Sequence, residues 1–355
     1  AYLKGTSRAG TDGAPRALVL RARLQQSGRT ATVTLALAGA CFLVLCVSLS
    51  LGKGDISVPE VVRALFSGDD TGTGYIVNHI RLPRTLVAVL TGAAFAISGA
   101  IFQTLVRNPL ASPDMLGVTV GASAAAVIGI VLLDLSGHAV SAAAFAGALA
   151  TAAVIYVLAW RGGVSGYRLV LTGIAMSAIL TSVVSYCMTR ADVYDARDAL
   201  GWLTGSLNAK SWPALRTIGL SCAVLIPAAL LANRRLTVLQ MGDDLARALG
   251  VQVERSRLAL IVIAAALAGA ATAVVGPVPF VALVAGPIAR RLTGNSGSAL
   301  IPAALVGALV MLTSDLAGQH AVGSVSLPVG VVTAIVGAPY LLWLLAMGNR
   351  AGRGE

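Results

Sequence analysis

The chain contains long runs of apolar residues without charge, and the clearest lies between Arg84 and Arg107. More than twenty successive residues of this run carry no charged side chain. Because a helix rises about 1.5 Å per residue, such a run is long enough to cross a bilayer. Small residues recur inside it at Gly92, Ala96 and Gly99, a spacing that lets helix backbones approach closely in lipid. The run therefore predicts a membrane-spanning helix that packs tightly against its neighbours.

The composition of the whole chain is that of a membrane protein. Hydrophobic residues make up 57% of the sequence and charged residues 12%, against a charged share of about 25% in soluble domains. We predict ten apolar segments, at residues 31–51, 84–106, 115–133, 138–160, 166–189, 213–232, 257–275, 278–289, 297–317 and 328–347. The eighth is too short to span fully, so we expect a broken or half-crossing helix there. The predicted fold class is an all-α polytopic membrane protein with about ten transmembrane helices.

The distribution of charge predicts the orientation. Ten crossings place both termini on one side, and that side holds 18 of the 26 Lys and Arg residues but 6 of the 15 acidic residues. By the positive-inside rule this side is the cytosol. We expect residues 1–30 to be a disordered basic cytosolic tail, residues 31–348 to be the transmembrane domain, and residues 349–355 to be a second cytosolic tail. The basic residues are not interleaved with aromatic residues, so nucleic-acid binding is not expected.

The cysteines and histidines do not predict a metal site. The four cysteines fall within apolar segments, where small core residues are expected rather than disulfides or ligands. The three histidines lie at external loops or helix ends without metal-binding spacing.

The first apolar run described above ends in a sharp break. Arg107, Asn108 and Pro109 close it, and Pro113 keeps the next residues out of a helix. Apolar sequence resumes at Met115. This stretch predicts a spanning helix, a tight turn and a return into the membrane.

From RLPR through RNPLASPDMLG to VGAS, residues 81–123 closely resemble the permease subunits of ATP-driven importers for iron–siderophore complexes and vitamin B12. In that family RLPR, a Gly/Ala-rich helix ending in Phe/Met-Gln, RNPLA, a proline and LGxxxGA occur in this order and spacing. The WLTGSL element at residues 202–207 and LPVGVVTAIVGAPYLLWLL at residues 327–345 are also similar to the family. The family's Pro-His pair is replaced here by Gly286-Pro287, which leaves the role of that histidine open.

The resemblance implies a permease of the bacterial plasma (inner) membrane that imports an iron(III)–siderophore complex or a related metal chelate. Vitamin B12 and haem are alternative substrates. The implied partners are a second permease subunit, identical or homologous, two cytosolic ABC ATPase subunits that bind ATP–Mg, an extracytoplasmic substrate-binding protein and the lipid bilayer.

The chain itself is expected to be non-catalytic and to bind no cofactor or metal. Its lysines are Lys4, Lys53 and Lys210, and none lies in a G-x-x-x-x-G-K-[ST] loop. An ion-coupled secondary transporter is the alternative from another class, and such proteins need carboxylates within the membrane. Here the acidic residues lie in loops or at helix ends, with Asp315 nearest to an exception.

An internal repeat supports a two-fold architecture. GAATAVVG at Gly269–Gly276 matches GAAFAISG at Gly92–Gly99 in five of eight positions. The predicted topology makes these two helices run in opposite directions, as an inverted repeat requires. In the family, helices two to five and seven to ten are related in this way.

The longest polar loop on the cytosolic side, residues 233–257, contains short amphipathic pieces. Leu245, Leu249 and Val251 form an apolar side, and Gly250 is a suitable helix C-cap. GDDLARALGV resembles the family's coupling loop, which packs into a groove on the ATPase subunit; a solvated loop is the alternative. The predicted coupling residues are Gly242, Asp243, Asp244, Ala246, Arg247, Leu249 and Gly250.

The fifth apolar segment carries a stripe of small and polar residues at every fourth position. The predicted translocation-path residues are Gly173, Ser177, Thr181 and Ser185, and Thr189 continues the stripe. Small-residue helix packing is the alternative explanation. In the family, this fifth helix lines the path.

The external loop, residues 52–81, contains a helix start at Ser57 and ends beside two arginines. Arg81 and Arg84 flank Pro83, which gives them a rigid setting. In the family, arginines at these positions receive acidic residues from the binding protein. A third family arginine is replaced here by Gln319. These three residues are the predicted dock, and arginines that reach towards lipid head groups are the alternative.

Overall fold

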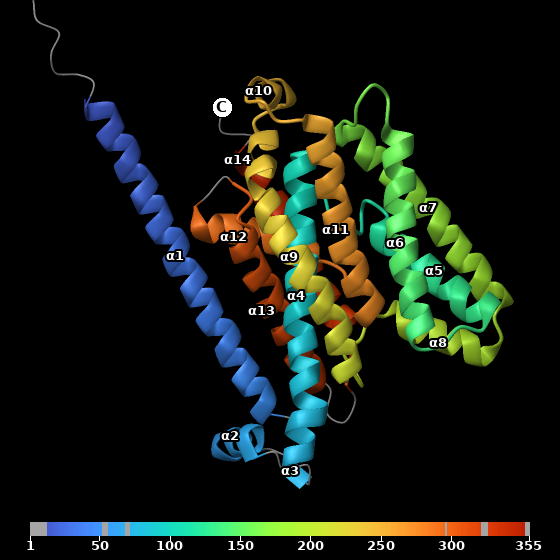
Figure 1. The fold of residues 1–355 in the computed structure, drawn as a ribbon. Helices are drawn as coiled ribbons and strands as arrows, with labels where there is room; N and C mark the ends of the chain where they lie inside the picture. Colours follow the sequence, from blue (N-terminus) through green and yellow to red (C-terminus); the bar gives the residue numbers. More distant parts are fainter. Residues whose placement is uncertain (1–12, 52–55, 68–71, 295–296, 321–325, 352–355) are drawn as a thin grey trace, which may run out of the picture.

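The structure is a computed structural model that describes residues 13–51, 56–67, 72–294, 297–320 and 326–351. Within these ranges the regular elements are helical, and the all-α fold expected from the sequence is confirmed (Figure 1). In chain order they are α1 (Gly13–Ser50), α2 (Val58–Ser67), α3 (Gly72–Tyr75), the π-helix η1 (Ile76–Arg81), α4 (Leu82–Val106), α5 (Val118–Leu133), α6 (His138–Ala159), α7 (Gly166–Arg190), α8 (Val193–Leu203), α9 (Trp212–Gln240), α10 (Asp243–Ala248), α11 (Val253–Val275), α12 (Val281–Thr293), α13 (Leu300–His320) and α14 (Val329–Ala351).

The predicted membrane segments correspond to helices. Among the described residues, seven helical stretches are long and apolar enough to cross a membrane, and α5 and the first part of α14 are shorter apolar helices. The eighth predicted segment corresponds to α12, which has only 13 residues. Residues 276–280 before it are not helical, so the predicted interruption lies there. Pro287 lies inside α12 without ending it.

The first helix begins earlier than expected. Residues 13–30 were predicted to belong to a disordered tail, but α1 already begins at Gly13. The RALVLRARLQQ sequence in this part is rich in Ala, Leu, Arg and Gln, which are strong helix formers. Residues 1–12 of this tail, and 352–355 of the C-terminal tail, lie outside the described residues.

The core is organised around α4, which is buried along most of its length and packs against α9, α11, α12 and α13. Two glycines let neighbouring backbones approach it. A methyl group at Gly92 would lie 2.4 Å from the carbonyl oxygen of Gly307 in α13, and one at Gly99 would lie 1.9 Å from that of Ala282 in α12. The close packing expected from the small-residue spacing of α4 is therefore confirmed.

The two predicted repeats are packed in a reciprocal way. One repeat consists of α4 to α7 and the other of α11 to α14. The first helix of the first repeat, α4, packs against the third helix of the second repeat, α13. In the same way, the first helix of the second repeat, α11, packs against the third helix of the first repeat, α6. The matching glycines lie at these crossings. Gly92 meets Gly307, and a methyl group at Gly269 would lie 2.8 Å from the Cβ of Ala148. In Figure 1, α4 begins near α3 and α11 begins near α10 at the opposite end.

The short helices cluster at the two ends of the bundle. In Figure 1, α10 lies at the top, whereas α2, α3 and α8 lie at the bottom. The predicted start of α2 is confirmed, because the Ser57 backbone N–H donates to Glu60 Oε2 at 3.1 Å and Val61 and Ala64 are buried. This pairing stabilises the first turn as in a capping box.

The WLTGSL element joins three parts of the lower end. The Ser206 N–H donates to Val275 O at 2.7 Å, and the Gly330 N–H donates to Gly205 O at 3.1 Å. Gly205 has φ 65°, and a methyl group there would lie 2.2 Å from Pro277 O. Only glycine fits this position, so the element fastens the interruption before α12 to the start of α14.

Candidate functional site

The candidate site is the short helix α10 and its attachments at the upper end of the bundle. Glycines bound this helix on both sides. Gly242 has φ 120° between α9 and α10, and Gly250 has φ 79° just after it, so both positions favour a residue without a side chain. The Gly250 N–H donates to Arg247 O at 2.9 Å and closes the last turn. The C-cap itself is Leu249, one residue before the predicted position, and Gly250 follows it with the positive φ that favours glycine.

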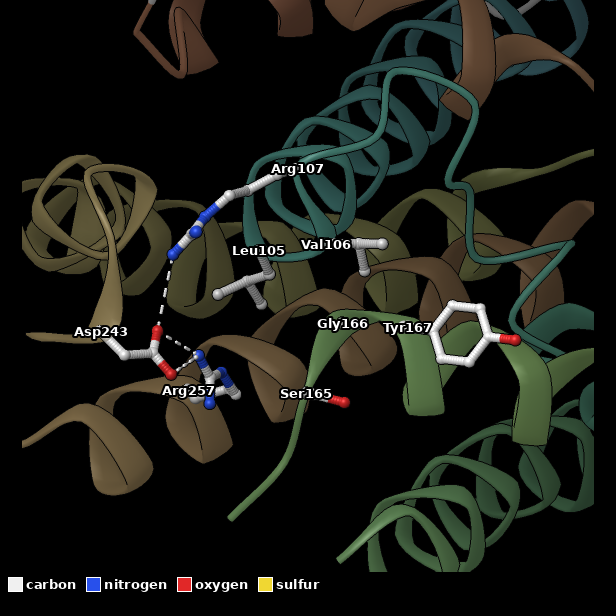
Figure 2. Close-up of a pocket in the computed structure, with 8 residues that line it drawn as sticks. All are labelled: Leu105, Val106, Arg107, Ser165, Gly166, Tyr167, Asp243 and Arg257. Atoms are coloured by element: carbon white, nitrogen blue, oxygen red, sulfur yellow. Dashed lines mark hydrogen bonds and ion pairs between the residues drawn. The ribbon is translucent and has the colours of Figure 1, made fainter.

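Asp243, the first residue of α10, binds two arginines from other helices (Figure 2). Arg257 Nη2, from α11, donates to its two carboxylate oxygens at 2.8 and 3.0 Å. Arg107 Nη2, just beyond α4, lies 3.5 Å from Asp243 Oδ1. Arg107 has φ 56° and also donates to Leu239 O at 3.0 Å. One carboxylate thus links the ends of α4, α9 and α11 to the start of α10.

Arg257 extends this network to the turn before α7. Its side chain is only 9% exposed, and its Nη1 donates to the carbonyl oxygen of Val164. Glu254 completes the set, since its Oε1 lies 3.5 Å from Arg257 Nη1 and its Oε2 accepts from the Val164 N–H at 3.4 Å. These contacts connect α10 to four neighbouring segments, namely α11, the ends of α4 and α9, and the turn before α7.

A cavity of 280 Å³ lies beside this ion pair. Its lining residues are Leu105, Val106, Arg107, Ser165, Gly166, Tyr167, Asp243 and Arg257. In Figure 2, Asp243 lies between the two guanidinium groups, while Ser165 and Tyr167 lie apart from them. The charged residues are arranged as a structural brace, with the carboxylate held by both guanidinium groups.

The other residues of α10 divide into an inner and an outer face. Ala246 is completely buried. Asp244 and Arg247 point outwards, with side-chain exposures of 103% and 58%, and pair with each other at 3.2 Å. Leu245 and Leu249 are also exposed. Of the predicted coupling residues, Asp244, Arg247 and Leu249 therefore form the outer face, whereas Asp243 and Ala246 attach the helix to the bundle.

The predicted path stripe on α7 falls into two parts. Gly173 is buried, and a methyl group there would lie 2.9 Å from the Cα of Leu116. Ser177 Oγ donates to Gly173 O at 2.9 Å and also faces the turn at Gly117. Thr181 and Ser185 are exposed. The upper half of the stripe thus packs against another segment, and the lower half lies on the surface of the chain.

The predicted docking residues have partners within the chain. Arg81 is 8% exposed, and its Nη1 donates to the last carbonyls of α1, Leu49 O and Ser50 O, at 2.8 and 2.9 Å. Arg84 and Gln319 both bind Asp315. Arg84 donates through Nε and Nη2, and Gln319 Nε2 donates at 2.8 Å. Sequence reasoning had singled out these three residues, but it did not identify Asp315 as the group between two of them.

The four cysteines are free, and three of them are buried, as expected of small core residues. Among the described residues, no group of three or more His, Cys, Asp and Glu side chains is placed to hold a metal ion. Arg107 and Arg257 belong to the site but had not been assigned to it from sequence. The signal for Arg107 was its place in the RNPLA motif, immediately before the chain turns back.

Comparison with known proteins extends over nearly the whole chain. The FecCD transport family matches residues 32–347. The chain is 40% identical over 324 residues to the ferric enterobactin transport system permease protein FepG of Escherichia coli (strain K12), covering 91% of this chain and 98% of the relative. It is 42% identical over 313 residues to the achromobactin transport system permease protein CbrC of Dickeya dadantii (strain 3937), covering 86% and 89%.

A solved structure of a metal-chelate type ABC transporter in an inward-facing conformation has the same fold. It superimposes with a TM-score of 0.78 at 25% identity and covers 89% of this chain and 99% of that one. The fold, the order of the motifs and the extent of these matches agree. This chain, a multi-pass membrane protein, belongs to the FecCD transport family.

Proposed function

We propose that this chain is the transmembrane permease subunit of an ATP-driven importer that moves an iron(III)–siderophore complex, or a related metal chelate, into the cytosol. The observation that carries the proposal is α10, a helix with an exposed outer face that is braced through Asp243 to the ends of three longer helices. Such a helix can receive force from a second protein and pass it to the bundle. The family membership, and the substrates in the names of the relatives, support the same function.

The proposed assembly contains a second permease chain, two ABC ATPase subunits and an external binding protein. The excess of Lys and Arg on the side of α10 supports a cytosolic location of that side, by the positive-inside rule. The ATPase would contact the outer face of α10, at Asp244, Arg247 and Leu249. The binding protein would approach the opposite end, where α2, α3 and α8 lie (Figure 1).

We assign the lower half of the α7 stripe to the translocation path. Thr181 and Ser185 are exposed hydroxyl-bearing residues on a helix that is long and apolar enough to span the membrane. Exposed hydroxyl groups offer hydrogen bonds to a polar chelate without holding it as metal ligands would. Gly173 and Ser177 position this helix by packing against the turn at Leu116 and Gly117.

The ion-coupled alternative is less well supported by the environment of Asp315. Its side chain is 4% exposed and pairs with Arg84 at 2.8 Å. A carboxylate that binds a transported ion must exchange that ion with water, whereas this one is neutralised by a guanidinium group of the same chain. An ATP-driven mechanism requires no such carboxylate.

Uptake by reconstituted vesicles tests the proposal. The permease, its ATPase subunits and its binding protein would be assembled, and uptake of labelled ferric hydroxamate, ferric catecholate, haem and cobalamin compared. We expect ATP-dependent uptake of an iron chelate and its loss when the ATPase lacks its phosphate-binding lysine. Uptake of haem or cobalamin alone would change the substrate class. Uptake driven by an ion gradient without ATP would overturn the proposal.

A further inference from the structure

A second cavity lies next to the end of α4, on the same side of the bundle as α10. Its volume is 590 Å³, within the range of about 300–1,000 Å³ typical of ligand cavities. The polar residues of its lining that carry the inference are Gln103, Arg107, Asn108, Gln240, Arg290 and Arg291. Three of these are arginines, and none of the described residues that line the cavity is acidic. The cavity in Figure 2 shares Arg107 but includes Asp243, so the two cavities differ in their charge balance.

Arg290 is held at the buried wall of this cavity by an amide. Its Nη2 donates to Gln103 Oε1 at 2.8 Å, and Gln103 Nε2 donates to Leu283 O at 2.8 Å. Gln103 is only 3% exposed. Because the amide oxygen accepts from Arg290 and the amide nitrogen is already used, Gln103 fixes the guanidinium group without neutralising its charge.

Arg291 is held by an aromatic ring. Its guanidinium carbon lies 5.0 Å from the centre of the Trp343 ring, a cation–π contact that also leaves the charge in place. In the part of the chain that the structure describes, neither Arg290 nor Arg291 forms an ion pair with a carboxylate. Arg107 differs from them, because its Nη2 lies 3.5 Å from Asp243 Oδ1.

We propose that this cavity binds a phosphate group, carried by the head group of an anionic phospholipid or present as free inorganic phosphate. Arg290 and Arg291 follow each other at this recess without a carboxylate partner among the described residues, and two such positive charges repel each other unless an anion lies between them. Guanidinium groups match phosphate oxygens with paired N–H donors. A phosphate also offers more acceptor oxygens than a carboxylate, which suits donors that converge from α4, α9 and α12.

The surroundings favour a lipid as the source of the phosphate. In α14, Trp343 is 45% exposed and Leu342 is also exposed. In α12, Leu292 is exposed next to Arg291. Tryptophan is enriched where a membrane protein meets lipid head groups, and basic recesses between membrane helices on the cytosolic side bind anionic head groups. The inference uses the membrane location of the chain and does not depend on what is transported.

Native mass spectrometry of the purified full-length permease would measure the site directly. The protein would be exposed to phosphatidylglycerol or phosphatidylcholine, and retained lipid counted. We expect retention of phosphatidylglycerol, weakening with added salt. The double variant Arg290→Gln/Arg291→Gln should retain about tenfold less, because each charge-assisted hydrogen bond is about twice as strong as a neutral one. Arg291→Gln alone, at an exposed residue that leaves Gln103 in place, should lower retention several-fold.

The matched control is Arg161→Gln, an exposed arginine on the same side of the bundle but outside the cavity. It should retain phosphatidylglycerol like the wild type.

If millimolar inorganic phosphate protects the cavity arginines from phenylglyoxal while no lipid is retained, the phosphate source is free phosphate and the site stands. In the absence of phosphate protection, equal retention of both lipids, or equal retention by wild type and double variant, would overturn it. So would a loss of ATPase-subunit affinity in the double variant without any change in lipid or phosphate binding, because the cavity would then accept protein carboxylates. None of these measurements requires transport.

Discussion

Arg84 and Asp315 form a two-point ion pair between α4 and α13. Arg84 Nε donates to Oδ2 of Asp315 at 3.0 Å and Nη2 donates to Oδ1 at 2.8 Å. Gln319 donates to the same carboxylate from the next turn of α13. The side-chain exposures are 17% for Arg84 and 4% for Asp315, so the pair lies almost entirely within the protein.

Arg84→Ala should therefore destabilise the fold rather than only alter the surface. It leaves a buried carboxylate without its counter-charge, and breaking a buried pair in this way costs about 3–5 kcal/mol. We expect a lower melting temperature in detergent and a smaller loss in the double variant Arg84→Ala/Asp315→Ala, which removes both charges. Equal stability of Arg84→Ala and the wild type would contradict the importance of the pair.

The same pair affects how a dock at Arg81 and Arg84 has to be tested. Reversing the charge of Arg84 would place two carboxylates together at Asp315 and damage the fold. Affinity for the binding protein would then fall because the permease is misfolded, whether or not Arg84 contacts that protein. The exchange Arg84→Asp/Asp315→Arg restores the opposite charges between α4 and α13 while it moves the guanidinium group. If Arg84 receives the binding protein, this exchanged variant should fold normally but bind its partner about tenfold more weakly, as expected for a lost charged contact. Unchanged affinity at low salt would place the dock elsewhere.

Asp243→Asn should uncouple α10 from the bundle. Arg257 would lose the closer of its two carboxylate partners and keep Glu254, at an expected cost of about 1–3 kcal/mol for hydrogen bonds to charged groups. We expect substrate-stimulated ATP turnover of the assembled transporter to fall by about tenfold, with the ATPase subunits still bound. Stimulated turnover and co-purification of the subunits check this together.

Asp244→Asn is the comparison variant for this experiment, because it changes the outer face of α10 and leaves the contacts of Asp243 intact. Its carboxylate is fully exposed and pairs with Arg247 on the same helix, and exposed pairs of this type contribute little to stability. Its effect through the brace should be small. Should the two variants lose stimulation equally, the outer face of α10 and not the brace would determine coupling.

Gly92→Leu should disrupt the crossing of α4 and α13. The position has no space for a side chain, because a single methyl group would already lie 2.4 Å from Gly307 O. Overpacking of a core costs about 1–3 kcal/mol and more where backbone must move. Gly39→Leu in α1, where nothing lies within 4 Å of the added group, is the matched control. Comparison of their melting temperatures and yields tests the expectation, and equal values would refute it.

Cysteine labelling should separate the two halves of the α7 stripe. With the four native cysteines replaced, cysteine at Thr181 should react with a small water-soluble thiol reagent in at least one transport state. Cysteine in place of Ser177, which faces the turn at Gly117, should react at least about tenfold more slowly. The reactive form is the thiolate, and it must be accessible to the reagent. Protection of Thr181→Cys in every state would assign the whole stripe to helix packing.

Asp114 should make stability depend on pH. It lies between α4 and α5, where burial raises the pKa of its carboxyl from 3.8 to about 6, although the hydroxyl of Thr119, which donates at 2.7 Å, favours the charged form. Because the folded pKa lies above the unfolded one, the folded state disfavours ionisation. The resulting decrease in the free energy of unfolding is absent below about pH 4, grows between about pH 4 and 6, and is complete above about pH 6. Asp114→Asn should therefore raise the melting temperature at about pH 7.5 more than at about pH 4.5. The same shift at both values would show that ionisation is not involved.

The membrane helices could be predicted from the sequence because each depends on local properties. The length of an uncharged run, the position of proline and the spacing of small residues were sufficient for α4, and the helix start at Ser57 was sufficient for α2. The early start of α1 was missed because the many arginines between residues 13 and 30 suggested a solvated tail, although their helix propensity is high.

The candidate site was predictable only in part, because its contacts join residues far apart in the chain. The outer face of α10 follows from the amphipathic GDDLARALGV sequence. The ion pairs of Asp243 bring together residues 107, 243 and 257, and no local pattern relates the first of these to the others. The division of the α7 stripe likewise depends on where residues 116 and 117 return to it.

The reciprocal crossings of α4 with α13 and of α11 with α6 limit how this chain can move. Each half holds its first helix inside the other half, and at Gly92 and Gly307 the backbones meet with no room to slide. We therefore expect the two halves not to rock apart as separate rigid bodies. A passage should instead open through shifts of the outer helices, such as α7 with its largely exposed surface, around this close-packed centre.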